Sequence, residues 1–149
     1  MTIRISRNFT FRGILDSRLN RYERNLRRAA PRTVNTIRRR TLSGLDANGR
    51  PFRRYSPEYA RTKAGLGGVG GVGGFNLSRP NLSLSGQMLQ SITSAVSRVN
   101  NTLKLRLGFQ GSRNARLALY HQTGDGVPQR KFFGLTPREK ANLTNLIKQ

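Results

Sequence analysis

The chain has 149 residues, which is enough for one domain with an apolar core of its own. It contains no cysteine, so disulfides and thiolate metal sites are excluded. Twenty-eight lysines and arginines face six acidic residues, and the net charge of +22 calls for an anionic counterpart: nucleic acid, an acidic protein surface or counterions.

The basic residues are spread along the chain, with +13 over residues 1–64 and +9 over the remainder. Most are arginine, which favours forked contacts with phosphate or carboxylate. No apolar run approaches the ~20 residues of a membrane span. The N-terminus also lacks the apolar segment of a secretory signal. We therefore expect a single domain over 1–149, synthesis in the cytoplasm and no membrane contact.

The first two predicted elements are a strand and a long helix. Residues 2–12 alternate between apolar and polar side chains, which predicts a strand. Asp16 is the expected N-cap of the helix, whose apolar stripe has spacings of three and four: Leu15, Leu19, Tyr22, Leu26, Ala30, Val34 and Ile37. Pro31 predicts a kink or a break in this helix, and Gly44 predicts its end.

A turn, a short helix and a glycine-rich loop follow. The run DANGRP is turn chemistry, and Ser56 with Pro57 predicts the start of a short helix over 57–64. Residues 65–74, GLGGVGGVGG, predict a flexible loop. This loop formally contains Gly-x-Gly-x-x-Gly. However, no strand precedes it and no acidic residue occurs between Glu58 and Asp125, so we expect no nucleotide site.

The second half of the chain predicts a short helix over 82–92, then a hairpin. Asn100-Asn101 suits a two-residue turn. In that register the buried face pairs Ile92 with Phe109, Ser94 with Leu107, and Val96 with Leu105. A further short helix over 113–121 should stop near Gly124, and Thr136 and Glu139 form a capping box for a C-terminal helix. The predicted class is α+β, with the long and C-terminal helices packed on a small antiparallel sheet.

The only histidine, His121, raises the question of catalysis. The chain has no Gly-x-Ser-x-Gly run and no cysteine, and the nearest acid is Asp125. One histidine and six scattered acids are also a poor supply of metal ligands. We therefore expect no enzyme activity, cofactor or metal. Instead, the His121 ring should bond the last carbonyls of a helix, where positive charge suits the dipole; contact with a partner is the alternative.

Three blocks, in order, resemble the virion morphogenesis or tail completion family of tailed bacteriophages. They are RTLSGLDANGRPFRRYSPEYARTK at 40–63, LSLSGQMLQSI at 82–92 and ALYHQTGDGVPQRKFFGLT at 118–136. The resemblance implies a structural protein of the virion neck that joins the tail to the head-side connector. It also implies a homo-oligomeric ring, expected to be sixfold, around the DNA channel. Its partners would be portal-side and tail-side proteins, with non-specific contact to genomic DNA.

This resemblance and the composition together select two sets of residues. The subunit-interface candidates are Phe52, Arg53, Arg54, Tyr55, Tyr59, His121, Gln122, Arg130, Phe132 and Phe133. The candidates for contact with phosphate or an acidic partner are Arg38, Arg39, Arg40, Lys104 and Arg106. In an extended chain one of Phe132 and Phe133 would face the core and the other a partner, unless both are buried.

A free nucleic-acid-binding module is the competing hypothesis. The net charge supports it, as do the aromatic residues among the arginines. No known DNA- or RNA-reading motif is present in the sequence. Tight binding to duplex DNA by the isolated protein, weakening steeply with salt, would favour this alternative over the virion protein.

Overall fold

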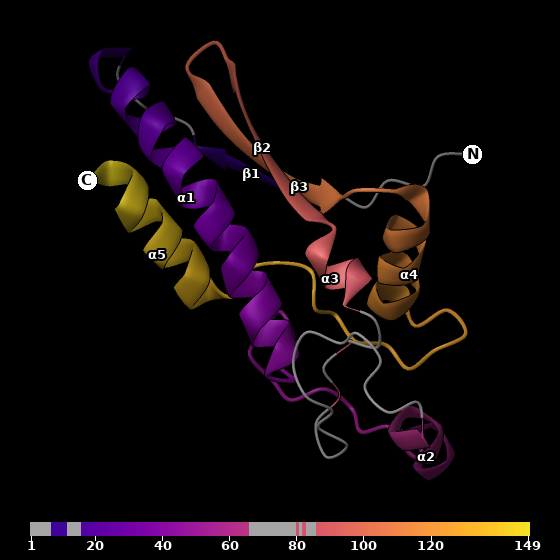
Figure 1. Ribbon diagram of the computed structural model, residues 1–149. Helices are drawn as coiled ribbons and strands as arrows, with labels where there is room; N and C mark the ends of the chain where they lie inside the picture. Colours follow the sequence, from indigo (N-terminus) through magenta and orange to yellow (C-terminus); the bar gives the residue numbers. More distant parts are fainter. Residues whose placement is uncertain (1–6, 12–15, 66–79, 81, 83–85) are drawn as a thin grey trace.

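The computed structural model describes residues 7–11, 16–65, 80, 82 and 86–149. Its elements, in chain order, are β1 (Arg7–Phe11), α1 (Asp16–Leu42), α2 (Pro57–Gly65), α3 (Gln87–Gln90), β2 (Ile92–Val99), β3 (Thr102–Phe109), α4 (Ser112–Thr123) and α5 (Pro137–Lys148). The predicted α+β class is confirmed (Figure 1). Residues 2–6 and 12 of the first predicted strand lie outside the described residues, as does the predicted glycine-rich loop apart from Gly65.

The sheet has the order β1-β3-β2, and both strand pairs are antiparallel. The predicted hairpin register is confirmed, with Val96 opposite Leu105. The two-residue turn is also confirmed, and Asn100 adopts the left-handed conformation (φ 51°) that it requires. One face of β3 is fully buried in the core: Leu103, Leu105 and Leu107. The alternate side chains Lys104 and Arg106 are exposed on the opposite face.

Helix α1 runs through Pro31 as one 27-residue helix, so the predicted break is wrong (Figure 1). Proline removes the hydrogen bond to the carbonyl four residues earlier, that of Arg27. Pro31 is exposed, so water can satisfy that carbonyl. Ala30 and Val34 are buried on the core side and hold the helix across the proline.

The end of α1 is the one that Gly44 predicts. Gly44 has φ 79°, its amide donates to the Thr41 carbonyl at 2.9 Å, and the Leu45 amide donates to the Arg40 carbonyl at 3.1 Å. This pair of bonds is a Schellman motif, which satisfies carbonyls that the helix leaves free. The turn redirects the chain into the segment that carries the interface candidates.

Helix α5 lies beside α1 on the side away from the hairpin (Figure 1). It begins with the predicted capping box: the Thr136 hydroxyl accepts from the Glu139 amide at 3.2 Å, and the Glu139 carboxylate accepts from the Thr136 amide at 2.8 Å. Leu143 and Ile147 are buried in the common core. The Asn25 side-chain amide donates to the Ile147 carbonyl at 3.1 Å and ties the end of α5 to α1.

The small helices α3 and α4 lie beside each other at the end of the hairpin that is opposite its turn (Figure 1). The predicted helix over 82–92 is wrong in length, because α3 has only four residues. The Ser91 carbonyl accepts from the Gln110 amide at 2.8 Å, so the hairpin ladder takes over before Ile92. Helix α4 ends at Gly124 as predicted. A side chain there would place its Cβ 3.0 Å from the Gln129 Cβ, and the φ of 84° favours glycine.

Candidate interaction surface

The segments that carry the three sequence blocks pack on one another. The Ala47 amide donates to the Lys131 carbonyl at 2.7 Å, which joins the first block to the third. The turn before it is held by Asp46, whose carboxylate accepts from the amides of Asn48 and Arg50, both at 2.8 Å. The first and third blocks thus form one structural unit, although residues 64–117 separate them in the chain.

Arg40 is the centre of this unit. Its guanidinium pairs with the Glu139 carboxylate and donates to the carbonyls of Phe132 at 2.6 Å and Gly134 at 2.9 Å. The Arg40 side chain is only 7% exposed. The prediction that Arg40 contacts phosphate or an acidic partner is therefore wrong, because its charge is neutralised by Glu139 and both terminal nitrogens bond acceptors inside the protein. Its buried Nε has no hydrogen-bond partner among the described residues.

Arg38, two residues before the first block, joins α1 to the second block. Its guanidinium donates to three carbonyls of the α3–β2 junction: Leu89 at 2.9 Å, Gln90 at 2.6 Å and Ile92 at 3.0 Å. Arg38 is half-buried. Its donors therefore hold the chain where α3 ends, rather than being available to a partner as predicted.

Tyr55, Tyr59 and Arg130 form an aromatic and basic cluster. The tyrosine rings lie with their centroids 5.0 Å apart, and the Arg130 guanidinium lies 5.0 Å from the Tyr55 centroid, within the range of a cation–π contact. Arg130 also donates to the Arg53 carbonyl at 3.3 Å. Only 4% of Arg130 is exposed, so its prediction as a direct contact residue is wrong. Burial lowers the pKa of its guanidinium, while the two tyrosines act to raise it.

His121 lies behind this cluster in the last turn of α4. Burial, and next the charge of Arg130, lower the pKa of His121 from 6.5 to about 4, so the ring is neutral at pH 7. Its buried Nδ1 has no hydrogen-bond partner among the described residues. The neutral ring therefore adds no positive charge at the helix end. The His121 carbonyl, however, accepts from the Arg130 amide at 2.7 Å and so positions the third block.

The phenylalanine pair is buried on both sides of the chain. Phe132 is 0% and Phe133 is 1% exposed, so of the two predicted alternatives the burial of both rings is confirmed, and the alternation between core and partner is not. The Phe133 ring lies 4.7 Å from that of Phe109, at the end of β3. The Gln122 side chain bonds both the amide and the carbonyl of Phe133 at 3.2 Å, which fixes the bend that buries both rings. Phe52 is also buried, at 6% exposure.

Other predicted contact residues remain at the surface. Tyr59 is 46% exposed, and Arg53 and Arg54 are exposed beside the half-buried Tyr55. We call these four residues, 53–55 and 59, the tyrosine–arginine surface. A rigid, partly exposed aromatic pair with flanking arginines is the composition of protein-interface anchors. Arg39, Lys104 and Arg106 are also exposed, but elsewhere on the molecule.

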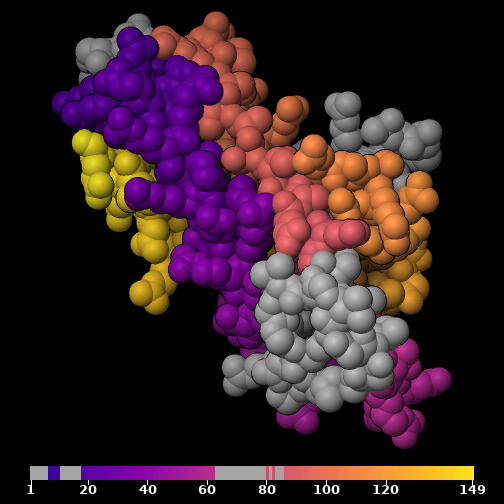
Figure 2. All heavy atoms as spheres, viewed as in Figure 1, coloured from indigo at the N-terminus to yellow at the C-terminus, as the bar shows by residue number. Residues whose placement is uncertain are grey.

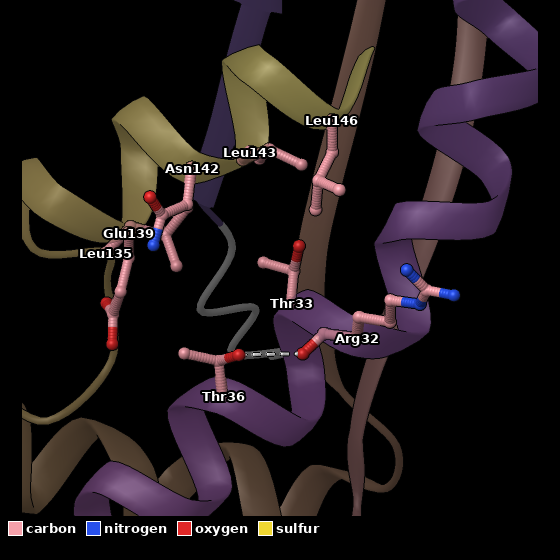
Figure 3. Close-up of a pocket in the computed structure, with 8 residues that line it drawn as sticks. All are labelled: Arg32, Thr33, Thr36, Leu135, Glu139, Asn142, Leu143 and Leu146. Carbon is pink, nitrogen blue, oxygen red and sulfur yellow. Dashed lines mark hydrogen bonds between the residues drawn. The ribbon is translucent and has the colours of Figure 1, made fainter. Parts of the chain in front are cut away.

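A hollow lies between α1 and α5 (Figure 3). Its lining residues come from both helices and the segment before α5: Arg32, Thr33, Thr36, Leu135, Glu139, Asn142, Leu143 and Leu146. Arg32 extends away from the acidic and amide groups, and the Thr36 hydroxyl donates to the Arg32 carbonyl at 2.9 Å. Because the Glu139 carboxylate is engaged by Arg40 and by the helix cap, this hollow offers no free acid for catalysis.

Two features are absent from the described part of the chain. None of its helices combines the length and apolar character needed to cross a membrane. In the same residues, no three His, Cys, Asp or Glu side chains come together in a way that could hold a metal ion. Comparison of the sequence and structure with protein-family models, curated proteins and solved structures finds no match.

Proposed function

We propose that this protein is a structural component of a tailed-phage virion, a neck or tail completion protein that forms a ring around the DNA channel. The proposal rests on the three sequence blocks that resemble that family. The observation that supports it most is that the first and third blocks converge around Arg40 and Arg130, two arginines whose partners are internal. These residues shape the segment that bears the tyrosine–arginine surface.

In this proposal, the tyrosine–arginine surface docks a neighbouring subunit or an acidic connector protein. Tyr59 supplies apolar area, and Arg53 and Arg54 supply forked donors for carboxylates. The internal contacts of Tyr55 with Tyr59 and Arg130 restrict the rings before binding, which reduces the entropy lost on assembly. The role is binding and assembly, and catalysis has no part in it.

The test is assembly with the adjacent connector proteins, followed by mass photometry and negative-stain imaging. We expect closed oligomers and incorporation into particles. The disruptive variant combines Arg54→Glu with Tyr59→Ala. Its control combines Arg98→Glu with Val99→Ala, which makes the same charge change at an exposed position on the hairpin tip, far from α2 (Figure 1).

Comparison of these variants with the wild type tests the docking surface and the neck function separately. Loss of closed oligomers in the first variant alone supports this docking surface, whereas assembly of both variants like the wild type rejects it. A wild-type chain that stays monomeric with the connector proteins and joins no particle rejects the neck function itself. Nanomolar, steeply salt-dependent DNA binding by such a monomer favours the free nucleic-acid-binding module.

A further inference from the structure

The outer face of α1 carries a row of exposed arginines that form no ion pair with an acidic side chain among the described residues. One of them, Arg21, has its guanidinium 5.5 Å from the Tyr22 ring centroid. Of the nine arginines in the helix, Arg40 is buried in its ion pair, Arg38 bonds carbonyls and Arg27 pairs with Glu23 at 2.7 Å. The others are exposed. Five of them form the row, which we call the arginine stripe: Arg21, Arg24, Arg28, Arg32 and Arg39.

Helix geometry places the stripe on a single narrow face. At about 100° per residue the five positions fall within an arc of roughly 80°. The buried residues Leu19, Leu26 and Ile37 lie on the opposite side of the helix. From Arg21 to Arg39 the stripe is about 27 Å long, since each residue rises about 1.5 Å. Figure 2 shows α1 as a continuous indigo-to-purple band along the face of the molecule that is in view.

We propose that the arginine stripe binds the phosphate backbone of duplex DNA without reading its sequence. A polyanion with a regular charge repeat suits a straight row of like charges that lie one or two helical turns apart. Over about 27 Å the stripe spans roughly eight base pairs at 3.4 Å each, so several guanidinium groups reach phosphates at once. Arginine forks match phosphate oxygens in geometry as well as charge.

An acidic protein surface is a poorer fit to the same face. Protein interfaces usually centre on buried apolar or aromatic anchors and have few charges in the middle. The stripe has no exposed large apolar residue: Tyr59, Val99 and Leu117, the exposed large apolar side chains among the described residues, all lie on other elements. Glu23, the acidic residue among the described side chains of α1, forms an ion pair with Arg27. The chemistry of the stripe therefore favours phosphate.

The test measures binding to duplex DNA at several salt concentrations. Binding is detected by the fluorescence anisotropy of a labelled duplex of mixed sequence. The stripe variant is Arg24→Gln, Arg28→Gln and Arg32→Gln together. The matched control is Arg61→Gln, Arg113→Gln and Arg116→Gln, which removes three exposed helical arginines from α2 and α4. We expect a wild-type Kd of about 10⁻⁴–10⁻⁶ M at physiological salt, as in non-specific binding.

Loss of three phosphate contacts should reduce the slope of log K against log salt by about 2–3, because each contact contributes ~0.9. The control should change the slope by less than ~1. An equal loss in both variants shows that only net charge matters and overturns the stripe. An unchanged slope in the stripe variant overturns it as well.

Two more measurements make the result independent of folding and of partner class. Replacement of the same three arginines by lysine retains their charge and should retain the slope; a loss like that of the glutamine variant would overturn the charge mechanism. Polyglutamate should compete much less than DNA of equal charge, and equal competition would reassign the stripe to an acidic protein. The inference does not depend on the proposed neck function, since particle incorporation and DNA binding are measured separately.

Discussion

Replacement of Arg40 by methionine tests whether the internal ion pair holds the proposed docking segment in place. The change removes the partner of Glu139 and the donors to the Phe132 and Gly134 carbonyls, while methionine fills much of the same volume. Loss of one partner of a buried pair typically costs about 3–5 kcal/mol. Because the Glu139 side chain is 15% exposed and water can reach it, we expect the lower end, about 3 kcal/mol.

The measurement is urea unfolding followed by circular dichroism, with thermal melting as a second probe. A loss of about 3 kcal/mol lowers the Tm of a chain of this size by roughly 6–12 °C. Arg39→Met is the matched control, since Arg39 is adjacent and exposed, and it should change stability by less than ~0.5 kcal/mol.

A double-mutant cycle with Glu139→Gln isolates the pair itself. If Arg40 and Glu139 stabilise each other, the sum of the stability losses in the two single variants should exceed the loss in the double variant by roughly 1–2 kcal/mol. A cost of less than about 1 kcal/mol for Arg40→Met, or an additive cycle, would refute the assignment of Arg40 as the internal clamp.

Three other positions give simpler predictions. Because the folded-state pKa of His121 is depressed from 6.5 to about 4, protonation favours the unfolded chain. The free energy of unfolding therefore has its full value above pH 6.5 and decreases as the pH falls toward about 4. Because His121 is only half-buried, we expect the decrease to be about 2 kcal/mol. When urea unfolding is measured at a series of pH values, His121→Gln should abolish this loss of stability. An unchanged dependence of stability on pH would contradict the prediction. Pro31→Ala restores the bond to the Arg27 carbonyl and should raise stability by about 1–3 kcal/mol in urea unfolding; a loss would show that α1 needs its proline. Gly44→Ala places a side chain at φ 79° and should cost about 1–2 kcal/mol in thermal melting, whereas a neutral result would contradict the Schellman end of α1.

The local elements could be predicted from the sequence because their determinants act over a few residues. The Thr136 capping box, the hairpin register and the glycine ends of α1 and α4 each depend on side chains within one turn or one strand pair. Pro31 was misleading, because the cost of proline in a helix depends on whether the lost bond faces water or the core. That orientation is set by the packing of α1.

The candidate site could be predicted only in part. Residues 53–55 and 59 lie together at or near the surface, as the sequence blocks suggest. Arg40, Arg130 and Phe133 were predicted as contact residues but are buried, and no local pattern distinguishes them from the exposed arginines and aromatics.

The charge, the class of fold and the positions of the helix caps and hairpin turn follow from the order of the residues alone. Which arginines are available to a partner depends on the packing of the whole chain. Arg40 finds its carboxylate ninety-nine residues away, and Arg130 finds its carbonyl acceptor seventy-seven residues away. Whether a guanidinium is an internal clamp or an external contact depends on such distant partners, because burying the charge is favourable only where the fold supplies acceptors for it.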